Sequence, residues 1–125
     1  MALSFFKPNG QKRVVITGIG AICPIGNTLQ DSWAAALRGQ SGISRITKFD
    51  TTQYDVTFAG EVKNFNADLY IDKKEQKKMD LFIQYALATS RMAFDQSGLK
   101  IDESNTDRTG VFIGSGLGGD RKSVV

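Results

Sequence analysis

Two short, uninterrupted apolar runs constrain the fold of this chain more than any other feature. Residues 13–17 read Arg-Val-Val-Ile-Thr, and residues 110–114 read Gly-Val-Phe-Ile-Gly. A strand that is apolar on both faces, without alternation, is typical of a parallel sheet covered by helices. The two runs therefore predict two buried strands of an α/β domain, and 125 residues suffice for one such domain but not for two.

The first helix between these runs is predicted to begin at Thr28. Either Asn27 or Thr28 is a suitable N-cap, and Asp31 lies in the first turn. A glycine, Gly39, is expected to end the helix. The apolar stripe of this helix consists of three residues at four-residue spacing, Leu29, Trp33 and Leu37.

A second and longer helix is predicted from about Asp72 to Gln96, and Gly98 is expected to end it. Its apolar residues recur at i, i+3, i+4, i+7 and i+8, which is strong helical periodicity. These residues are Met79, Phe82, Ile83, Ala86, Leu87, Ala93 and Phe94.

Between the two helices, residues 57–62 (TFAGEV) are predicted to form a short strand. Residues 40–53 are predicted to form a loop because Ser, Gly and Thr are interspersed among them. The predicted order is β-α-β-α-β, which indicates an α/β layered fold.

The chain contains no histidine and only one cysteine, Cys23. Its residues therefore cannot form a Ser-His-Asp triad, a Cys-His pair, a His-ligated metal site or an internal disulfide. A nucleophilic thiolate needs a base or another group that lowers its pKa, and the setting Ala-Ile-Cys-Pro-Ile is apolar. We therefore favour a buried, unreactive Cys23 over a nucleophile, and we expect no catalytic residue and no metal ligand.

The charge balance and the apolar runs also exclude some classes of protein. The 16 Lys and Arg residues against 13 Asp and Glu residues leave a formal charge of +3, too little to indicate a nucleic-acid partner. No stretch approaches the roughly 18 apolar residues of a membrane span. A lone cysteine and the absence of a signal-peptide pattern favour a cytoplasmic protein.

A glycine cluster, Gly-Ser-Gly-Leu-Gly-Gly at residues 114–119, contains a formal GxGxxG after the predicted strand 110–114. In a dinucleotide-binding domain such glycines bring a pyrophosphate to a helix N-terminus, but the motif normally follows the first strand. A turn used for packing is favoured, and a nucleotide-binding domain is kept as a weaker alternative. No cofactor is expected. Residues 17–20 (Thr-Gly-Ile-Gly) complete neither glycine spacing and are also assigned to packing.

Four lysines open the predicted helix 72–96, in the run Lys73-Lys-Glu-Gln-Lys-Lys78. On a helix, Lys74, Lys77 and Lys78 share one face, and Lys73 lies beside Lys77. Lysines in the first turns oppose the helix dipole. The run therefore indicates either a solvated face or a surface for an acidic partner.

Six segments together resemble the N-terminal part of the β-ketoacyl-acyl carrier protein synthases, most closely the type II condensing enzymes of bacterial fatty-acid synthesis. The resemblance runs almost continuously from Arg13 to Gly119. In order, the segments are RVVITGIGAICPIGN, SWAAALRGQSGIS, KFDTTQY, FAGEV, KKEQKKMDLFIQYAL and GVFIGSGLGG.

The resemblance implies a thiolase-like fold, of which this chain would hold the first part of the N-terminal αβ half. It also implies a homodimer that elongates acyl chains by decarboxylative Claisen condensation with malonyl-acyl carrier protein. On this basis residues 12–119 are an incomplete synthase segment, residues 1–11 a flexible arm and residues 120–125 a divergent tail. The chain would be an N-terminal fragment that is inactive alone.

The resemblance also bears on individual residues. The family's nucleophilic cysteine lies in an Ala-Cys-Ser/Thr stretch, and Cys23 does not match it. The basic positions that meet the acidic carrier protein in this family match Lys74, Lys77 and Lys78, with Lys73 also basic, so these four lysines become a candidate docking surface. The alternative is a non-catalytic module that binds acyl carrier protein.

Overall fold

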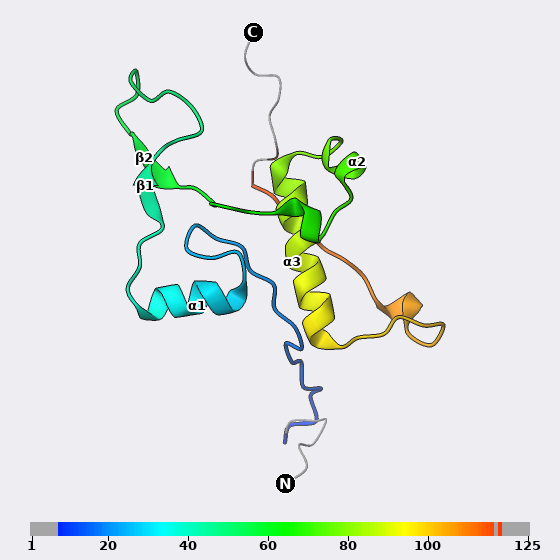
Figure 1. Ribbon diagram of the computed structural model, residues 1–125. Coiled ribbons are helices and arrows are strands. Elements are labelled where there is room, and N and C mark those ends of the chain that lie inside the picture. Colours follow the sequence, from blue (N-terminus) through cyan, green and yellow to red (C-terminus); the bar gives the residue numbers. More distant parts are fainter. Residues whose placement is uncertain (1–7, 117, 119–125) are drawn as a thin grey trace.

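The computed structural model describes residues 8–116 and residue 118, and its ribbon is drawn in Figure 1. Residues 1–7 of the expected arm at 1–11, together with Gly119 and the expected tail at residues 120–125, lie outside the described residues. In chain order the elements are α1 (Leu29–Leu37), β1 (Ile43–Arg45), β2 (Phe58–Gly60), the 3-10 helix η1 (Ala67–Leu69), α2 (Lys73–Gln76), α3 (Leu81–Ser97) and the 3-10 helix η2 (Thr106–Arg108).

Helix α1 begins and ends where its sequence signals predict. The Thr28 side chain accepts a hydrogen bond from the Asp31 amide at 3.1 Å, which satisfies one of the free N–H groups of the first turn. At the other end Arg38 is the C-cap, and the next residue, Gly39, adopts a left-handed backbone with φ of 67°. The predicted helix is therefore confirmed.

Strands β1 and β2 form an antiparallel pair in which Ile43 lies opposite Gly60 and Arg45 opposite Phe58. The predicted strand at 57–62 is confirmed over three residues. The predicted loop at 40–53 is wrong over Ile43–Arg45. Strand β1 is stabilised by its hydrogen bonds to β2. Its own amino-acid composition therefore does not identify it as a strand.

The long helix predicted over residues 72–96 is two helices in the structure. Helix α2 is a single turn, residues 77–80 leave the helical path, and α3 begins at Leu81. The backbone at Asp80, which precedes α3, is extended with ψ of 159°. The C-terminal boundary is confirmed, because Gly98 adopts φ of 66° there.

The predicted parallel strands at 13–17 and 110–114 are not formed, so the predicted order β-α-β-α-β is wrong for the described part of the chain. Val14 is 95% exposed and Phe112 is 98% exposed. A strand needs a neighbouring strand to bind its amides and carbonyls, and apolar β-branched composition cannot replace one. The sheet within residues 8–116 is the antiparallel β1–β2 pair alone.

The N-terminal segment instead packs along α3, as Figure 1 shows for the blue trace beside the yellow helix. The Ile19 amide donates a 2.6 Å hydrogen bond to Oε1 of Gln96. A Cβ atom at Gly18 would overlap the Ala93 carbonyl, and one at Gly20 would overlap the Thr89 carbonyl. The expectation that these glycines serve close packing is confirmed.

The buried apolar core of the described residues is small and consists of Ala35, Ile71 and Ala88. In Figure 1, α1 and the β1–β2 pair lie to one side, while α2, α3 and η2 lie to the other. Within the described part of the chain, no helix is both long and apolar enough to cross a membrane.

Candidate functional site

The four lysines lie on the short segment that joins η1 to α3. Lys73 and Lys74 belong to α2, Lys77 caps its C-terminus, and Lys78 follows in the non-helical residues. All four side chains are exposed. We call Lys73, Lys74, Lys77 and Lys78 the lysine cluster. The sequence correctly places them together on the surface, although not on one continuous helix.

Two glutamine side chains form hydrogen bonds across the interruption between α2 and α3. The Gln76 side-chain amide donates to Oδ1 of Asp68 at 2.9 Å and to the Ile71 carbonyl at 2.7 Å. The Gln84 side-chain amide donates to the carbonyls of Gln76 and Met79, both at 3.2 Å. These carbonyls lie where the helix is interrupted, and the Gln76 carbonyl also accepts from the Met79 amide at 3.2 Å. The glutamines therefore add side-chain hydrogen bonds to the interrupted region.

Aromatic packing anchors the same segment to α3. The ring of Phe65 meets Tyr85 of α3 edge-on with centroids 4.9 Å apart, and it stacks on Tyr70 with centroids 6.3 Å apart. Ile71, which follows Tyr70 in the sequence, is buried. Burial also raises the pKa of the Tyr85 hydroxyl. The lysine cluster therefore rests on an anchored turn.

Two members of the lysine cluster form ion pairs and two do not. Lys73 Nζ lies 3.3 Å from Oδ2 of Asp68. Lys78 Nζ lies 2.6 Å from Oε1 of Glu75. Within the described part of the chain, Lys74 and Lys77 have no ion pair. The reasoning from sequence missed Asp68 and Glu75, although the i, i+3 spacing of Glu75 and Lys78 is a signal for one pair.

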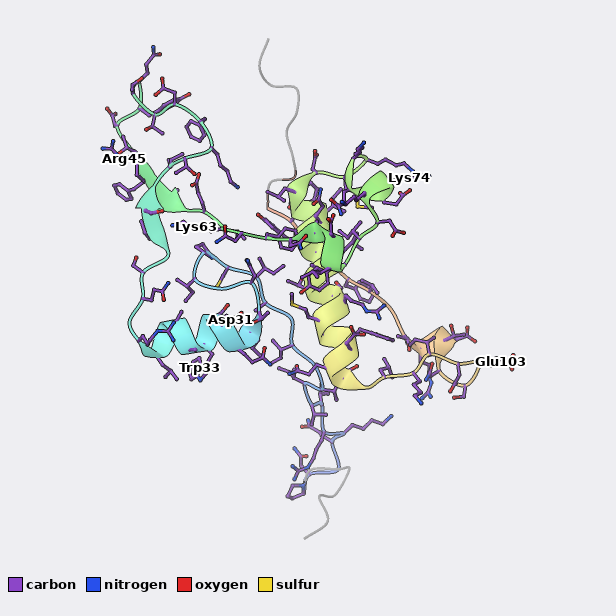
Figure 2. All side chains as sticks on the ribbon, in the orientation of Figure 1. Asp31, Trp33, Arg45, Lys63, Lys74 and Glu103 are labelled. Atoms are coloured by element: carbon purple, nitrogen blue, oxygen red, sulfur yellow. The ribbon has the colours of Figure 1, made fainter. Side chains whose placement is uncertain are left out.

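A polar hollow of about 380 Å³ lies beside the cluster. It is lined by Asp68, Lys73, Gln76, Lys77 and Gln84. The hydrogen bond from Gln76 and the nearby Lys73 lower the pKa of Asp68, with burial opposing them, so this carboxylate is charged at neutral pH. Figure 2 shows Lys74 at α2, well separated from Glu103 near η2.

Cys23 lies in a tight turn before α1 and is half-buried rather than fully buried as expected. Its thiol donates to Oγ of Ser32 at 3.2 Å. Hydrogen bonding with Ser32 and with the amides of Ile25 and Gly26 lowers the pKa of the thiol, against the effect of burial. No imidazole is available in the chain to act as its base.

The glycine cluster lies at the end of the described residues. The strand predicted to precede it is absent, and no helix begins at residues 114–116. Gly114 and Gly116 have open space around them, whereas a Cβ at Gly118 would lie 3.2 Å from the Phe82 ring. The described part of the cluster therefore lacks the helix N-terminus that a pyrophosphate site uses.

The structure also contains a carboxylate that the sequence analysis overlooked, Glu61. It is buried and accepts hydrogen bonds from the Thr47 hydroxyl and from the amides of Thr47 and Lys48. Because Glu61 directly follows β2, these hydrogen bonds link the loop that follows β1 to the end of β2. Among the described residues no group of three or more His, Cys, Asp or Glu side chains is arranged to hold a metal ion.

Comparison with known proteins matches almost the whole chain. The family described as "Beta-ketoacyl synthase, N-terminal domain" matches residues 11–125. The chain is 52% identical over 109 residues to the 3-oxoacyl-[acyl-carrier-protein] synthase 2 of Vibrio cholerae, and 54% identical over 108 residues to the protein of that name from Staphylococcus aureus. The matches cover 87% and 86% of this chain and 26% of each relative.

A solved structure, "The ishigamide ketosynthase/chain length factor", is similar with a TM-score of 0.63 and 37% sequence identity. That match covers 69% of this chain and 21% of the other. The chain thus spans about a quarter of the length of its curated relatives. The resemblance drawn from the six sequence segments is confirmed: this chain belongs to the β-ketoacyl synthase family and corresponds to part of the N-terminal domain of its members.

Proposed function

We propose that this chain supplies the N-terminal part of a type II 3-oxoacyl-acyl carrier protein synthase, an enzyme that elongates acyl chains in fatty-acid synthesis. The observation that carries the proposal is the identity of about one half to the synthases of Vibrio cholerae and Staphylococcus aureus. In the reaction, an acyl group passes from acyl carrier protein to a cysteine. Malonyl-acyl carrier protein then loses CO₂, and its carbanion attacks the acyl thioester and expels the cysteine thiolate.

The bond-making chemistry is assigned to residues other than those present here. The reaction depends on a cysteine, two histidines and a lysine in this family, while the chain has no histidine and Cys23 does not match the nucleophile. The contribution proposed for these 125 residues is therefore recognition of the carrier protein and structural support, and the chain alone is expected to be inactive.

The lysine cluster is the proposed docking surface. Acyl carrier protein is strongly acidic, and exposed lysines at a rim raise the rate of association with an acidic partner. Four exposed lysines on an anchored turn support this role. Such contacts weaken as salt rises, because the Debye length shortens from about 10 Å at 0.1 M to about 3 Å at 1 M.

A chimaera tests the proposal directly. This chain replaces the matching quarter of the Staphylococcus aureus synthase 2, and condensation of acyl- and malonyl-acyl carrier protein is measured. An active chimaera is expected, and a folded but inactive one contradicts the proposal. In the active chimaera, Lys74→Glu with Lys78→Glu is expected to slow transfer from acyl carrier protein but not from a small thioester. Equal losses with both substrates would remove the docking role.

A non-catalytic module that binds acyl carrier protein is the second candidate, and the lysine cluster in a chain without histidine favours it. Titration of the 125-residue chain with acyl carrier protein at low salt separates the two. Absence of binding leaves only the role as part of a synthase. The homodimer of the family and a cytoplasmic location are proposed along with the synthase role, and the mass of the chimaera in solution tests the former.

A further inference from the structure

The charges around the lysine cluster are balanced, although the sequence run suggests a basic patch. Residues 68–80 contain four lysines and four carboxylates. The carboxylates are Asp68, Asp72, Glu75 and Asp80. Attraction of an acidic partner therefore depends on which lysines the neighbouring carboxylates already occupy.

From this arrangement we infer that Lys74 and Lys77 make the first contacts with the acidic partner, while Asp68 and Glu75 restrain Lys73 and Lys78 in competing ion pairs. The inference rests on the proposed docking of acyl carrier protein. It adds a difference within the lysine cluster: two lysines are unpaired within the described residues, and two are held in weak ion pairs with which the partner's carboxylates must compete.

The two ion pairs are exposed to solvent, so an approaching carboxylate can displace Asp68 or Glu75. The side chains are exposed by 80% and 47% in the Lys73–Asp68 pair, and by 67% and 48% in the Lys78–Glu75 pair. Both pairs are therefore in contact with water, where an ion pair contributes little to stability. Each acts as a weak restraint, worth about a two- to five-fold change in an equilibrium constant.

The restraints differ in how firmly their carboxylates are held. Asp68 also accepts the 2.9 Å hydrogen bond from Gln76, which fixes it at the edge of the hollow. Glu75 has Lys78 as its side-chain partner, at 2.6 Å. Removal of the Glu75 charge therefore releases Lys78 with little other change, whereas a change at Asp68 also disturbs Gln76. Glu75 is the better site for a test.

The experiment measures binding of fluorescently labelled acyl carrier protein to the active chimaera with the Staphylococcus aureus synthase 2, at low salt. We expect Glu75→Gln to tighten binding about two- to five-fold, because Lys78 is released. We expect Lys74→Gln to weaken binding more than Lys78→Gln does. Far-UV circular dichroism of each variant verifies that the helices are retained.

Two matched controls separate release of a lysine from a simple change in charge. Asp72→Asn removes the same charge from the same segment, and Asp72 forms no side-chain capping bond at the start of α2. Glu103→Gln removes one charge far from α2 (Figure 2). Both are expected to tighten binding less than Glu75→Gln. Equal tightening by Asp72→Asn and Glu75→Gln would overturn the inference.

A second measurement does not depend on the carrier protein. NMR signals of the lysine Nζ groups in the chain alone report pairing, and Glu75→Gln is expected to change the signal of Lys78 and leave that of Lys74 unchanged. If Lys78 is insensitive to Glu75, the restraint is absent and the inference fails while docking stands. If no lysine variant alters carrier-protein binding, the docking proposal itself fails.

Discussion

The carboxylate of Glu61 holds Thr47 by both its amide and its hydroxyl, with Oε2 at 3.1 Å from the nitrogen and 2.8 Å from Oγ1. Oε1 accepts a further bond from the Lys48 amide at 3.3 Å. The hairpin loop between β1 and β2 is thus tied to the residue that follows β2. Hydrogen bonds from several donors favour the ionised form of this carboxylate.

This contact predicts a pH dependence. Hydrogen bonding from the Thr47 hydroxyl, and then from the two amides, lowers the pKa of Glu61 against the effect of burial. The contribution of a carboxylate with a lowered pKa is present above its ordinary pKa and is lost as pH falls through the lowered value. An NMR titration is expected to show the Thr47 and Lys48 amide signals changing together, with a midpoint below that of a free glutamate. Glu61→Gln is expected to abolish this shared transition.

The packing of the N-terminal segment on α3 predicts that Gly18→Ala and Gly20→Ala destabilise the fold. The added methyl group would overlap a helix carbonyl in each case, and backbone atoms move less easily than side chains. We expect a loss of about 1–3 kcal/mol per substitution, measured by urea unfolding. Gly114→Ala is the matched control, since nothing lies within 4 Å of its Cβ position. Equal losses at Gly114 would contradict the packing.

The cap of α1 predicts that Thr28→Ala lowers stability by about 1 kcal/mol. The Thr28 hydroxyl accepts from the Asp31 amide and donates to Oδ2 of Asp31 at 2.7 Å, so both groups lose a partner. Helical signal in circular dichroism during urea unfolding measures the effect. Thr28→Ser keeps the hydroxyl and is expected to retain most of the stability; a loss as large as that of alanine would argue against the cap.

The exposed apolar runs predict that the 125-residue chain self-associates. Unpaired apolar segments invite pairing with other chains. Phe112→Lys is expected to reduce association, and since the ring is 98% exposed, helix content should be unchanged. Sedimentation velocity measures the association. Lys12→Gln, outside both runs, is the control, and an unchanged sedimentation profile for Phe112→Lys would refute a role for residues 110–114.

Local signals in the sequence were sufficient for several elements. Helix α1 begins after Thr28 and ends before Gly39, and α3 ends before Gly98. These ends are predictable because a capping side chain and a left-handed glycine act within one turn of the helix. The periodicity from Phe82 to Phe94 likewise identifies α3. The lysine cluster was visible because its members are adjacent in the chain.

The remaining features depend on contacts between residues distant in sequence. Strand β1 exists because β2 pairs with it, and in the interruption before Leu81 the Gln84 side chain donates to the carbonyls of Gln76 and Met79. The runs at 13–17 and 110–114 have strand-forming residues but no neighbouring strand within the described residues. Their composition therefore predicted two strands that the described structure does not form.

For the candidate site, the sequence was enough to name the four lysines, and the family resemblance led to the hypothesis of an acidic partner. The folded chain adds that Asp68 and Glu75 occupy two of them. The physical reason is range: capping and periodicity act over a few residues along the chain, while pairing and charge neutralisation depend on which groups folding brings within a few ångströms of one another.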